Sequence, residues 1–378
     1  MTTGAAKTNL LGMSHDMLED FFAARGEKPF RARQLMQWIY QRYVTDFDEM
    51  TDLSKKLREQ LRDEAEVVLP TIQSRHASTD GTVKWLFATD CGQAIETVFI
   101  PEPDRGTLCI SSQVGCALDC AFCATGAQGF NRNLTSAEII GQVFVANQEL
   151  PRRENGDPAV TNVVFMGMGE PLANYRNVVP TLRLLISDWA FGLSRRRVTI
   201  STSGIIPHID KLAEDCNVSL AVSLHAPNDE LRDRIVPINK LHPIADLLDA
   251  CWSYAEKRAN RFITCESVML RGVHDSLAHA DELYELLRNR PAKVNLIPFN
   301  PFPGTAFKRS SIDTIQHFQN RLRQRGLVAT TRRTRGDDIN AACGQLAGEV
   351  SNRVTNRLGE KKIGEARLGG SNQKVASA

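Results

Sequence analysis

The sequence has no long apolar run and almost no net charge. No stretch approaches the roughly 18 apolar residues that a membrane-spanning helix requires. The first residues, MTTGAAKTNLLGMSH, lack the basic and apolar regions of a secretory signal peptide. The formal net charge is only +2 in 378 residues, so bulk charge gives no preference for nucleic acid. We therefore expect a soluble, cytoplasmic protein without a membrane partner.

The cysteines, in contrast, are numerous and unevenly spaced. There are nine of them, an odd number, and three fall within eight residues of one another at Cys116, Cys120 and Cys123. In a cytoplasmic chain of this size, clustered cysteines indicate metal or redox chemistry rather than a disulfide framework.

The N-terminal third of the chain changes from a helical to a β pattern. Apolar residues recur at three- and four-residue spacing in DMLEDFFAARG, RARQLMQWIYQR and LSKKLREQLRDE. Short strand-like segments follow, TIQSRHAS and TVKWLFAT on either side of an Asp80-Gly81 turn and then AIETVFIP. We predict a helical accessory domain over residues 1–65 and a β-extension over 66–105.

Strands and helices alternate from residue 106 to residue 336. The strand-like segments are TLCISSQ, VTNVVFMG, RRVTIST, VSLAVSLHA, FITCESVML, KVNLIPFNP and LVATTRR, and Thr135 with Glu138 forms a capping box that opens the first intervening helix. Repeated β-α units predict a parallel sheet, either an open doubly wound one or a full or partial barrel. Both place an active site at the carboxyl ends of the strands. A cysteine-containing segment, 337–350, and a flexible tail, 351–378, complete the chain.

The segment CALDCAFCATG follows the first of these strands. Its spacing, Cys-x3-Cys-x2-Cys, lets three thiolates reach three corners of one iron–sulfur cube, whereas a cluster that only transfers electrons usually has four cysteine ligands. A zinc site would need a fourth ligand nearby, and the local sequence offers no histidine. We expect Cys116, Cys120 and Cys123 to bind a 4Fe-4S cluster with one open iron, where S-adenosylmethionine (SAM) is chelated and cleaved.

Polar or glycine residues end four further strands. Any one of them suits an ordinary cap or turn, but together they predict a ligand site at the mouth of the barrel. They are Gly169 and Glu170 in GMGEP, Ser201 in ISTSG, Ser223, Leu224 and His225 in VSLHAP, and Asn300 in FNPFPG.

Taken together, CALDCAFCATG, GMGEP, VSLHAP, NPFPG and ACGQL resemble the radical SAM family of RNA methyltransferases that comprises the C2-directed RlmN and C8-directed Cfr enzymes. The resemblance spans nearly the whole chain. It implies a partial (β/α)6-type TIM-like barrel with a helical N-terminal domain and a β-extension. It also implies SAM contacts at Gly169, Glu170, Ser201, Ser223, Leu224, His225 and Asn300. Cys343 then resembles the cysteine that is methylated, Cys109 the one that resolves the intermediate, and Glu96 the carboxylate that handles the proton.

The family's chemistry explains why two extra cysteines are present. C2 of adenine is electron-poor and does not displace a methyl group from a sulfonium, but a carbon radical adds to it. By the family mechanism, Cys343 accepts a methyl group from one SAM. A radical derived from a second SAM activates that group for addition to the base, and Cys109 then forms a disulfide with Cys343 as the methylated RNA leaves.

The resemblance implies adenine 2503 of 23S rRNA and adenine 37 of certain tRNAs as substrates, a flavodoxin or ferredoxin as reductant, and a monomer. Three alternatives stay open: the C8-directed reaction, an electron-transfer iron–sulfur protein, and a zinc-binding RNA-binding module. The base must leave its stack to react. Basic residues on the N-terminal helices and in three later clusters could grip RNA, and a solvated face explains them equally well. They are Arg25, Lys28, Arg31, Arg33 and Arg42; Arg195–Arg197; Arg332, Arg333 and Arg335; and Arg353, Arg357, Lys361 and Lys362.

Overall fold

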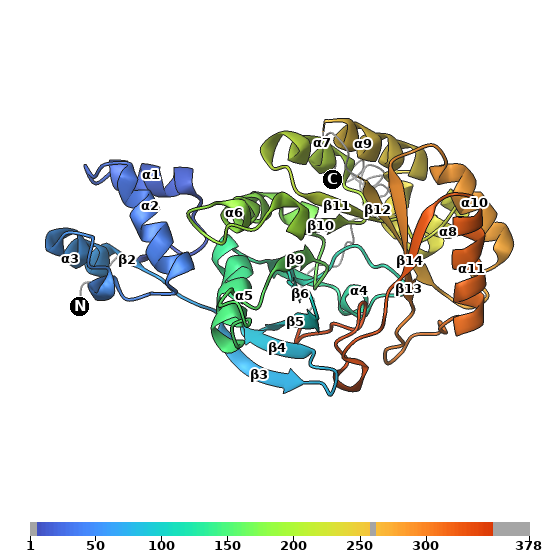
Figure 1. Ribbon diagram of the computed structural model, residues 1–378, viewed down its shortest axis with the longest axis horizontal. Helices are drawn as coiled ribbons and strands as arrows, with labels where there is room; N and C mark the ends of the chain where they lie inside the picture. Colours follow the sequence, from blue (N-terminus) through green and yellow to red (C-terminus); the bar gives the residue numbers. More distant parts are fainter. Residues whose placement is uncertain (1–5, 258–261, 351–378) are drawn as a thin grey trace, which may run out of the picture.

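The computed structural model describes residues 6–257 and 262–350 (Figure 1). The predicted tail, 351–378, with the basic cluster Arg353, Arg357, Lys361 and Lys362, lies outside the described residues. Within them, a ten-stranded sheet has the order β14-β13-β12-β11-β10-β9-β6-β5-β4-β3. Seven neighbouring strands run parallel: β6 (Arg105–Cys109), β9 (Asn162–Phe165), β10 (Val198–Thr202), β11 (Ser219–Ser223), β12 (Ile263–Met269), β13 (Ala292–Pro298) and β14 (Val328–Thr331).

Six of these strands are followed by helices, which gives six β-α units before β14. The helices are α4 (Ala124–Gln128) and α5 (Ser136–Glu149), α6 (Tyr175–Ile186), α7 (Ile206–Asp215), α8 (Asp229–Ile235) and α9 (Ile244–Glu256), α10 (Leu277–Leu287) and α11 (Ile312–Gln324). In the described part of the chain the sheet is open, with β3 and β14 at its edges. The predicted partial barrel is confirmed, and so is the capping box, because Thr135 and Glu138 exchange both bonds at the start of α5.

The β-extension continues the barrel sheet in antiparallel fashion. It comprises β3 (Thr71–Ala77), β4 (Val83–Ala88) and β5 (Ala94–Glu102), and β5 pairs directly with β6. The predicted Asp80-Gly81 turn joins β3 to β4, with Gly81 at a φ of +83°. Because Val98 on β5 is opposite Cys109 on β6, the extension places Glu96 near the carboxyl end of the first barrel strand.

The N-terminal helices, dark blue in Figure 1, lie beside α5 and α6. They are α1 (His15–Ala23), α2 (Phe30–Met36), a π-helical turn (Gln37–Gln41) and α3 (Lys55–Glu64), and β1 (Thr8–Asn9) pairs with β2 (Ala65–Glu66) at their base. Tyr43 contacts Phe144 of α5 with ring centroids 5.1 Å apart, and Tyr40 contacts Phe191 at 5.4 Å. Aromatic packing therefore joins this region to the barrel.

The short elements complete the fold. Strands β7 (Gln113–Gly115) and β8 (Phe130–Asn133) bracket the cysteine loop, and five 3-10 turns span Phe47–Glu49, Pro171–Asn174, Arg195–Arg197, Pro237–Lys240 and Asp337–Ile339. The main hydrophobic core fills the barrel and reaches the N-terminal helices. A second, smaller core lies against the cysteine loop and includes Leu118, Ile235 and Phe299, with Cys116 and Cys120 packed on it.

Candidate active site

The three clustered cysteines occupy one half-buried loop after β7. The Cys116 N–H donates to the Gly129 carbonyl at 2.7 Å, and the Cys123 N–H donates to the Cys120 carbonyl at 3.0 Å. Burial raises the pKa of the Cys120 thiol to about 12, and the nearby Cys123 thiol adds to that rise. Burial likewise raises the pKa of Cys116 well above its usual value. Thiols whose pKa values are raised in this way are favoured as thiolates only when a cation binds them.

The three cysteines form a set of thiol donors on one loop. In the part of the chain that the structure describes, no three cysteine sulfurs lie within 4.8 Å of one another. A single zinc with Zn–S bonds of ~2.3 Å would draw its thiolates to about 3.8 Å apart. The corners of an iron–sulfur cube hold their ligands farther apart, and these three cysteines could supply three of them.

The GMGEP segment turns sharply beside this loop. Gly169 has a φ of +97°, and a Cβ there would lie 2.5 Å from Cβ of Gln113, so only glycine fits. The Gln113 side chain accepts a 2.8 Å hydrogen bond from the Glu170 N–H. The Glu170 carboxylate accepts backbone hydrogen bonds from Leu172 at 3.0 Å and Ser203 at 2.8 Å. Burial raises the pKa of Glu170 to about 7, and a bound ammonium group would offset that burial.

His225 lies between the cysteine loop and β12. Its Nδ1 accepts a hydrogen bond from the Val268 N–H at 3.1 Å, so in the neutral ring Nε2 carries the proton. Burial lowers the pKa of His225 well below its usual value, which keeps the ring neutral. Its ring packs edge-on against Phe122, with centroids 4.5 Å apart. The predicted histidine therefore offers a single N–H donor beside the cysteine loop.

The other predicted strand-end residues hydrogen-bond to neighbouring strands and loops. Ser201 donates to the Glu266 carboxylate at 3.3 Å, and the carbonyls of Ser223 and Leu224 both accept from Arg232. The Asn300 amide donates to the Cys343 carbonyl at 3.1 Å. The residues predicted from four separate strand ends thus lie at the same end of the sheet, the carboxyl end of its parallel strands.

The Cys343 segment is half-buried, and hydrogen bonds hold it over the cysteine loop. The Gly344 carbonyl accepts from the Ala124 N–H at 2.9 Å, and the Leu346 carbonyl accepts from the Thr125 hydroxyl at 2.5 Å. Burial raises the pKa of the Cys343 thiol, while the Arg332 guanidinium opposes that rise and hydrogen-bonds the sulfur. Cys343 therefore lies between the cysteine loop and a positive charge.

Cys109 and Glu96 complete the cluster of predicted residues. Burial raises the pKa of the Cys109 thiol to about 12, and the adjacent Cys343 thiol raises it further. Glu96 forms an ion pair with Lys84 at 2.9 Å, and its other oxygen accepts from the Ala347 N–H at 2.9 Å. The carboxylate predicted on β5 therefore contacts the segment that carries Cys343.

Sequence reasoning missed several residues that shape this site: Lys84, Ser203, Arg232, Glu266 and Arg332. Arg332 had been considered only as part of a basic cluster, yet it bonds Glu266 at 3.2 Å and contacts the Met166 sulfur at 3.0 Å. The position of Arg332 directly after β14, at a strand end, could have indicated that it belongs to the site.

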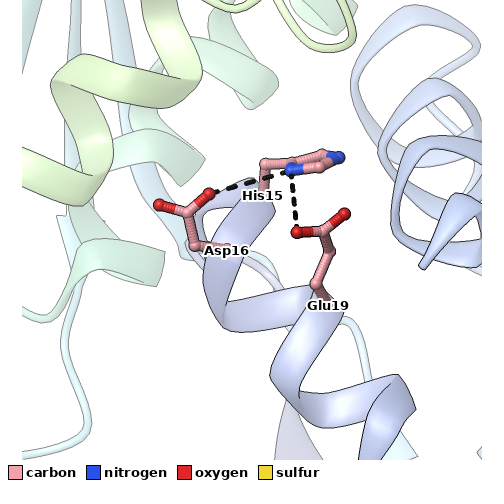
Figure 2. Close-up of side chains that lie close together, drawn as sticks. All are labelled: His15, Asp16 and Glu19. Carbon is pink, nitrogen blue, oxygen red and sulfur yellow. Dashed lines mark ion pairs between the residues drawn. The ribbon is translucent and has the colours of Figure 1, made fainter.

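A metal-like grouping on α1 does not belong to this site. Figure 2 shows His15 facing the carboxylates of Asp16 and Glu19, with nitrogen–oxygen distances of 3.8 and 3.7 Å. Asp16 also lies 3.6 Å from Arg183, and its side chain is 75% exposed. Surface ion pairing accounts for the grouping.

Comparisons with known proteins agree with this geometry. Residues 8–67 match the ribosomal RNA large subunit methyltransferase N-terminal domain, and residues 110–287 match the radical SAM superfamily. A dual-specificity RNA methyltransferase RlmN from Marinobacter nauticus is 54% identical over 355 residues, covering 94% of this chain and 96% of that relative. The crystal structure of a radical SAM methyltransferase from Sphaerobacter thermophilus superposes with a TM-score of 0.83 at 46% identity, covering 90% of this chain and 99% of that one. No helix in residues 6–257 and 262–350 is long and apolar enough to span a membrane.

Proposed function

This chain belongs to the RlmN family of radical SAM RNA methyltransferases, and on that basis we propose that it methylates C2 of adenine 2503 in 23S rRNA and of adenine 37 in tRNAs. The observation that carries the proposal is the meeting of Cys343, Cys109 and Glu96 beside the cysteine loop. An electron-transfer protein or a zinc module needs no second pair of thiols at that place. The C8-directed reaction uses the same residues and is the second candidate.

We assign Cys116, Cys120 and Cys123 as the ligands of a 4Fe-4S cluster, and the strand-end residues as the SAM contacts. Glu170 suits the ammonium group of SAM, because it is a buried carboxylate whose protein partners, two backbone N–H groups and the Thr202 side chain, are all uncharged. When bound, the cluster supplies the electron that cleaves SAM. His225 offers one N–H donor, while Gly169 leaves room for close approach of the ligand to the backbone.

Cys343 takes up a methyl group by displacement at the sulfonium, for which its sulfur must lose a proton. Arg332 favours the thiolate, and Asn300 fixes the backbone carbonyl of the same residue. The 5′-deoxyadenosyl radical from the second SAM takes a hydrogen atom from the S-methyl group, and the resulting carbon radical adds to C2 of the base. The adduct then loses one electron, which the cluster would take back, and the C2 proton, which Glu96 accepts. Cys109 then attacks the sulfur of Cys343, an S–S bond forms, and the electron pair of the broken C–S bond leaves with the carbon, which takes up a proton. Each turnover consumes two SAM molecules.

The direct test is anaerobic purification with a reconstituted cluster, incubation with SAM, a reductant and a 23S rRNA fragment, and mass spectrometry of the nucleosides. We expect 2-methyladenosine together with 5′-deoxyadenosine. Recovery of 8-methyladenosine would move the assignment to the second candidate. Absence of both nucleosides, in protein that carries a full cluster, would refute methyl transfer.

Two cysteine variants separate the proposed roles. Cys109→Ala is expected to trap a covalent protein–RNA adduct, because the thiol that releases Cys343 is missing. Cys343→Ala has no sulfur to bond to the methyl carbon and is expected to form no adduct. Equal, adduct-free inactivity in both variants would remove the resolving role of Cys109.

RNA binding is assigned to the N-terminal helices and the exposed Arg195–Arg197 turn. Arg33 lies over the ring of Trp189 at 5.2 Å, and that ring is 39% exposed, which suits contact with an unstacked base. We retain the division into the helical domain 1–65, the extension 66–105, the barrel 106–336 and the cysteine segment 337–350. A monomeric, cytoplasmic enzyme reduced by a flavodoxin or ferredoxin completes the proposal.

A further inference from the structure

Arg232, in α8, is fully buried, with 0% of its surface exposed. A guanidinium has five N–H groups, and here every nitrogen has partners at hydrogen-bond distance. The acceptors are the carbonyls of Leu224 (3.0 Å), Ser203 (2.7 Å), Ser223 (3.1 Å) and His242 (3.5 Å) and the side-chain oxygen of Asn239 (2.7 Å).

Three of these acceptors belong to the strand ends that form the proposed SAM site. Ser223 ends β11 and Leu224 follows it, and Ser203 follows β10. Ser203 also donates its N–H to the Glu170 carboxylate at 2.8 Å and hydrogen-bonds the Cys120 thiol through its side chain. The Arg232 side chain thus joins the loops that follow β10 and β11. Ser203 connects it to Cys120, a proposed cluster ligand.

Helix α8 also supports the cysteine loop itself. The Ile235 carbonyl, in its last turn, accepts a 3.1 Å hydrogen bond from the Ala121 N–H. Ile235 and Leu118 belong to the small hydrophobic core on which Cys116 and Cys120 pack. Movement of α8 would therefore displace the loop.

The charge of Arg232 has no carboxylate in direct contact in the part of the chain that the structure describes. Asn239 lies between Arg232 and the two nearest carboxylates. Its side-chain oxygen accepts from Arg232, and its amide nitrogen donates to Asp229 at 2.8 Å and to Asp233 at 2.7 Å. The guanidinium interacts electrostatically with the Cys120 thiol. In a buried site such an interaction is only weakly screened.

We propose that Arg232 is a positioning residue with two effects: it locks the β10 and β11 loops for SAM, and its buried positive charge raises the reduction potential of the cluster. The second effect follows because three thiolate ligands make the cluster anionic, and one-electron reduction adds a further negative charge. The inference rests on the proposed cluster assignment.

The test is a potentiometric titration of the reconstituted holoenzyme followed by electron paramagnetic resonance, with SAM affinity measured on the same samples. Arg232→Gln removes the charge and is expected to lower the reduction equilibrium constant about tenfold, or ~59 mV for one electron. Arg232→Lys keeps the charge but lacks the planar guanidinium with its several N–H donors. The reduction equilibrium constant should therefore change less than threefold, while SAM binds at least tenfold more weakly. Arg234→Gln, an exposed neighbour on α8, is the matched control and should change neither quantity.

Asp233→Asn tests the charge effect without touching Arg232. Asparagine keeps an acceptor for Asn239 but removes a negative charge, so the potential should rise, opposite to Arg232→Gln. An unchanged potential in folded, cluster-loaded Arg232→Gln would overturn the charge effect. If that variant fails to hold a cluster, an unchanged potential in Asp233→Asn overturns it instead. Normal SAM affinity in Arg232→Lys would overturn the locking effect. Failure of the wild-type chain to assemble a 4Fe-4S cluster would count against the proposed function and not against Arg232.

Discussion

Replacing Arg332 with methionine should cost far more stability than a surface substitution. Its guanidinium lies 3.2 Å from Glu266, whose side chain is only 4% exposed. The neutral partners of that carboxylate, Ser201 and Asn295, are both at 3.3 Å. Removing the cation leaves a buried charge without a counter-ion, a change that costs about 3–5 kcal/mol in fully buried pairs. The Arg332 side chain is 33% exposed, so we expect the lower end, about 3 kcal/mol.

The double variant tests the physical cause. Glu266→Gln has roughly the shape of the native side chain and keeps an acceptor for Ser201, so it relieves the charge that Arg332→Met leaves unpaired. The cost of both substitutions together should be smaller than the sum of the single costs. We expect a coupling free energy of about 2 kcal/mol, within the range for residues in one ion-pair network.

Urea unfolding of samples with matched cluster content measures these differences as shifts in midpoint at a constant slope. Arg333→Met serves as the control, because Arg333 is an exposed neighbour and its loss should change stability by less than about 0.5 kcal/mol. A cost below about 1 kcal/mol for Arg332→Met would make the pair equivalent to a surface ion pair. Additivity of the two single costs would show that Arg332 and Glu266 do not depend on each other.

Three further predictions concern individual residues. Burial raises the pKa of Cys343 and Arg332 opposes that rise, so Arg332→Met should reduce the thiolate fraction at a given pH. The pH profile of RNA-independent methyl incorporation into Cys343, followed by peptide mass spectrometry, should then shift to higher pH. An unchanged profile would contradict this role of Arg332. Gly169→Ala places a Cβ 2.5 Å from another side chain at a φ of +97° and should weaken SAM binding at least tenfold by calorimetry, whereas Gly156→Ala, at a φ of +81° with nothing within 4 Å, should leave it unchanged. Thr135→Ala removes the cap of α5 and should destabilise the protein by about 1 kcal/mol in urea unfolding; no change would mean that packing alone holds that helix.

The fold could be predicted wherever the local pattern and the tertiary environment agree. The alternation VKWLFA gave β4, whose burial alternates residue by residue, and the capping box gave the start of α5. The alternation of strands and helices implies a helix between β9 and β10, but the position of α6 was not predicted, because Pro180 lies inside it and a proline removes an internal hydrogen bond. Burial of Val178, Leu182 and Leu185 stabilises that helix despite the proline. Helix α8 was missed as well, since its seven residues are too few for an apolar periodicity.

The residues of the candidate site likewise fall into those that the sequence could indicate and those that it could not. Cys116, Cys120 and Cys123 lie close together in sequence, so their spacing alone indicates a shared ligand. Glu266 lies on β12 and Arg332 directly follows β14, and only the parallel order of the sheet brings their side chains together. No pattern in a single sequence states which strands are neighbours, and therefore their pairing could not be read from it.

Ser203 shows why such residues leave so little trace in the sequence. Its N–H binds Glu170, its carbonyl binds Arg232, and only its hydroxyl, bonded to Cys120, depends on its being serine. Two of the three links are made by backbone atoms. Every residue has the carbonyl, and every residue except proline has the N–H. Their placement depends instead on the β10 loop, which Arg232 holds from outside the site. The geometry of the proposed SAM site is therefore set partly by a buried side chain that need not touch the ligand, and the motifs identify the ligand-binding atoms without identifying what holds them in place.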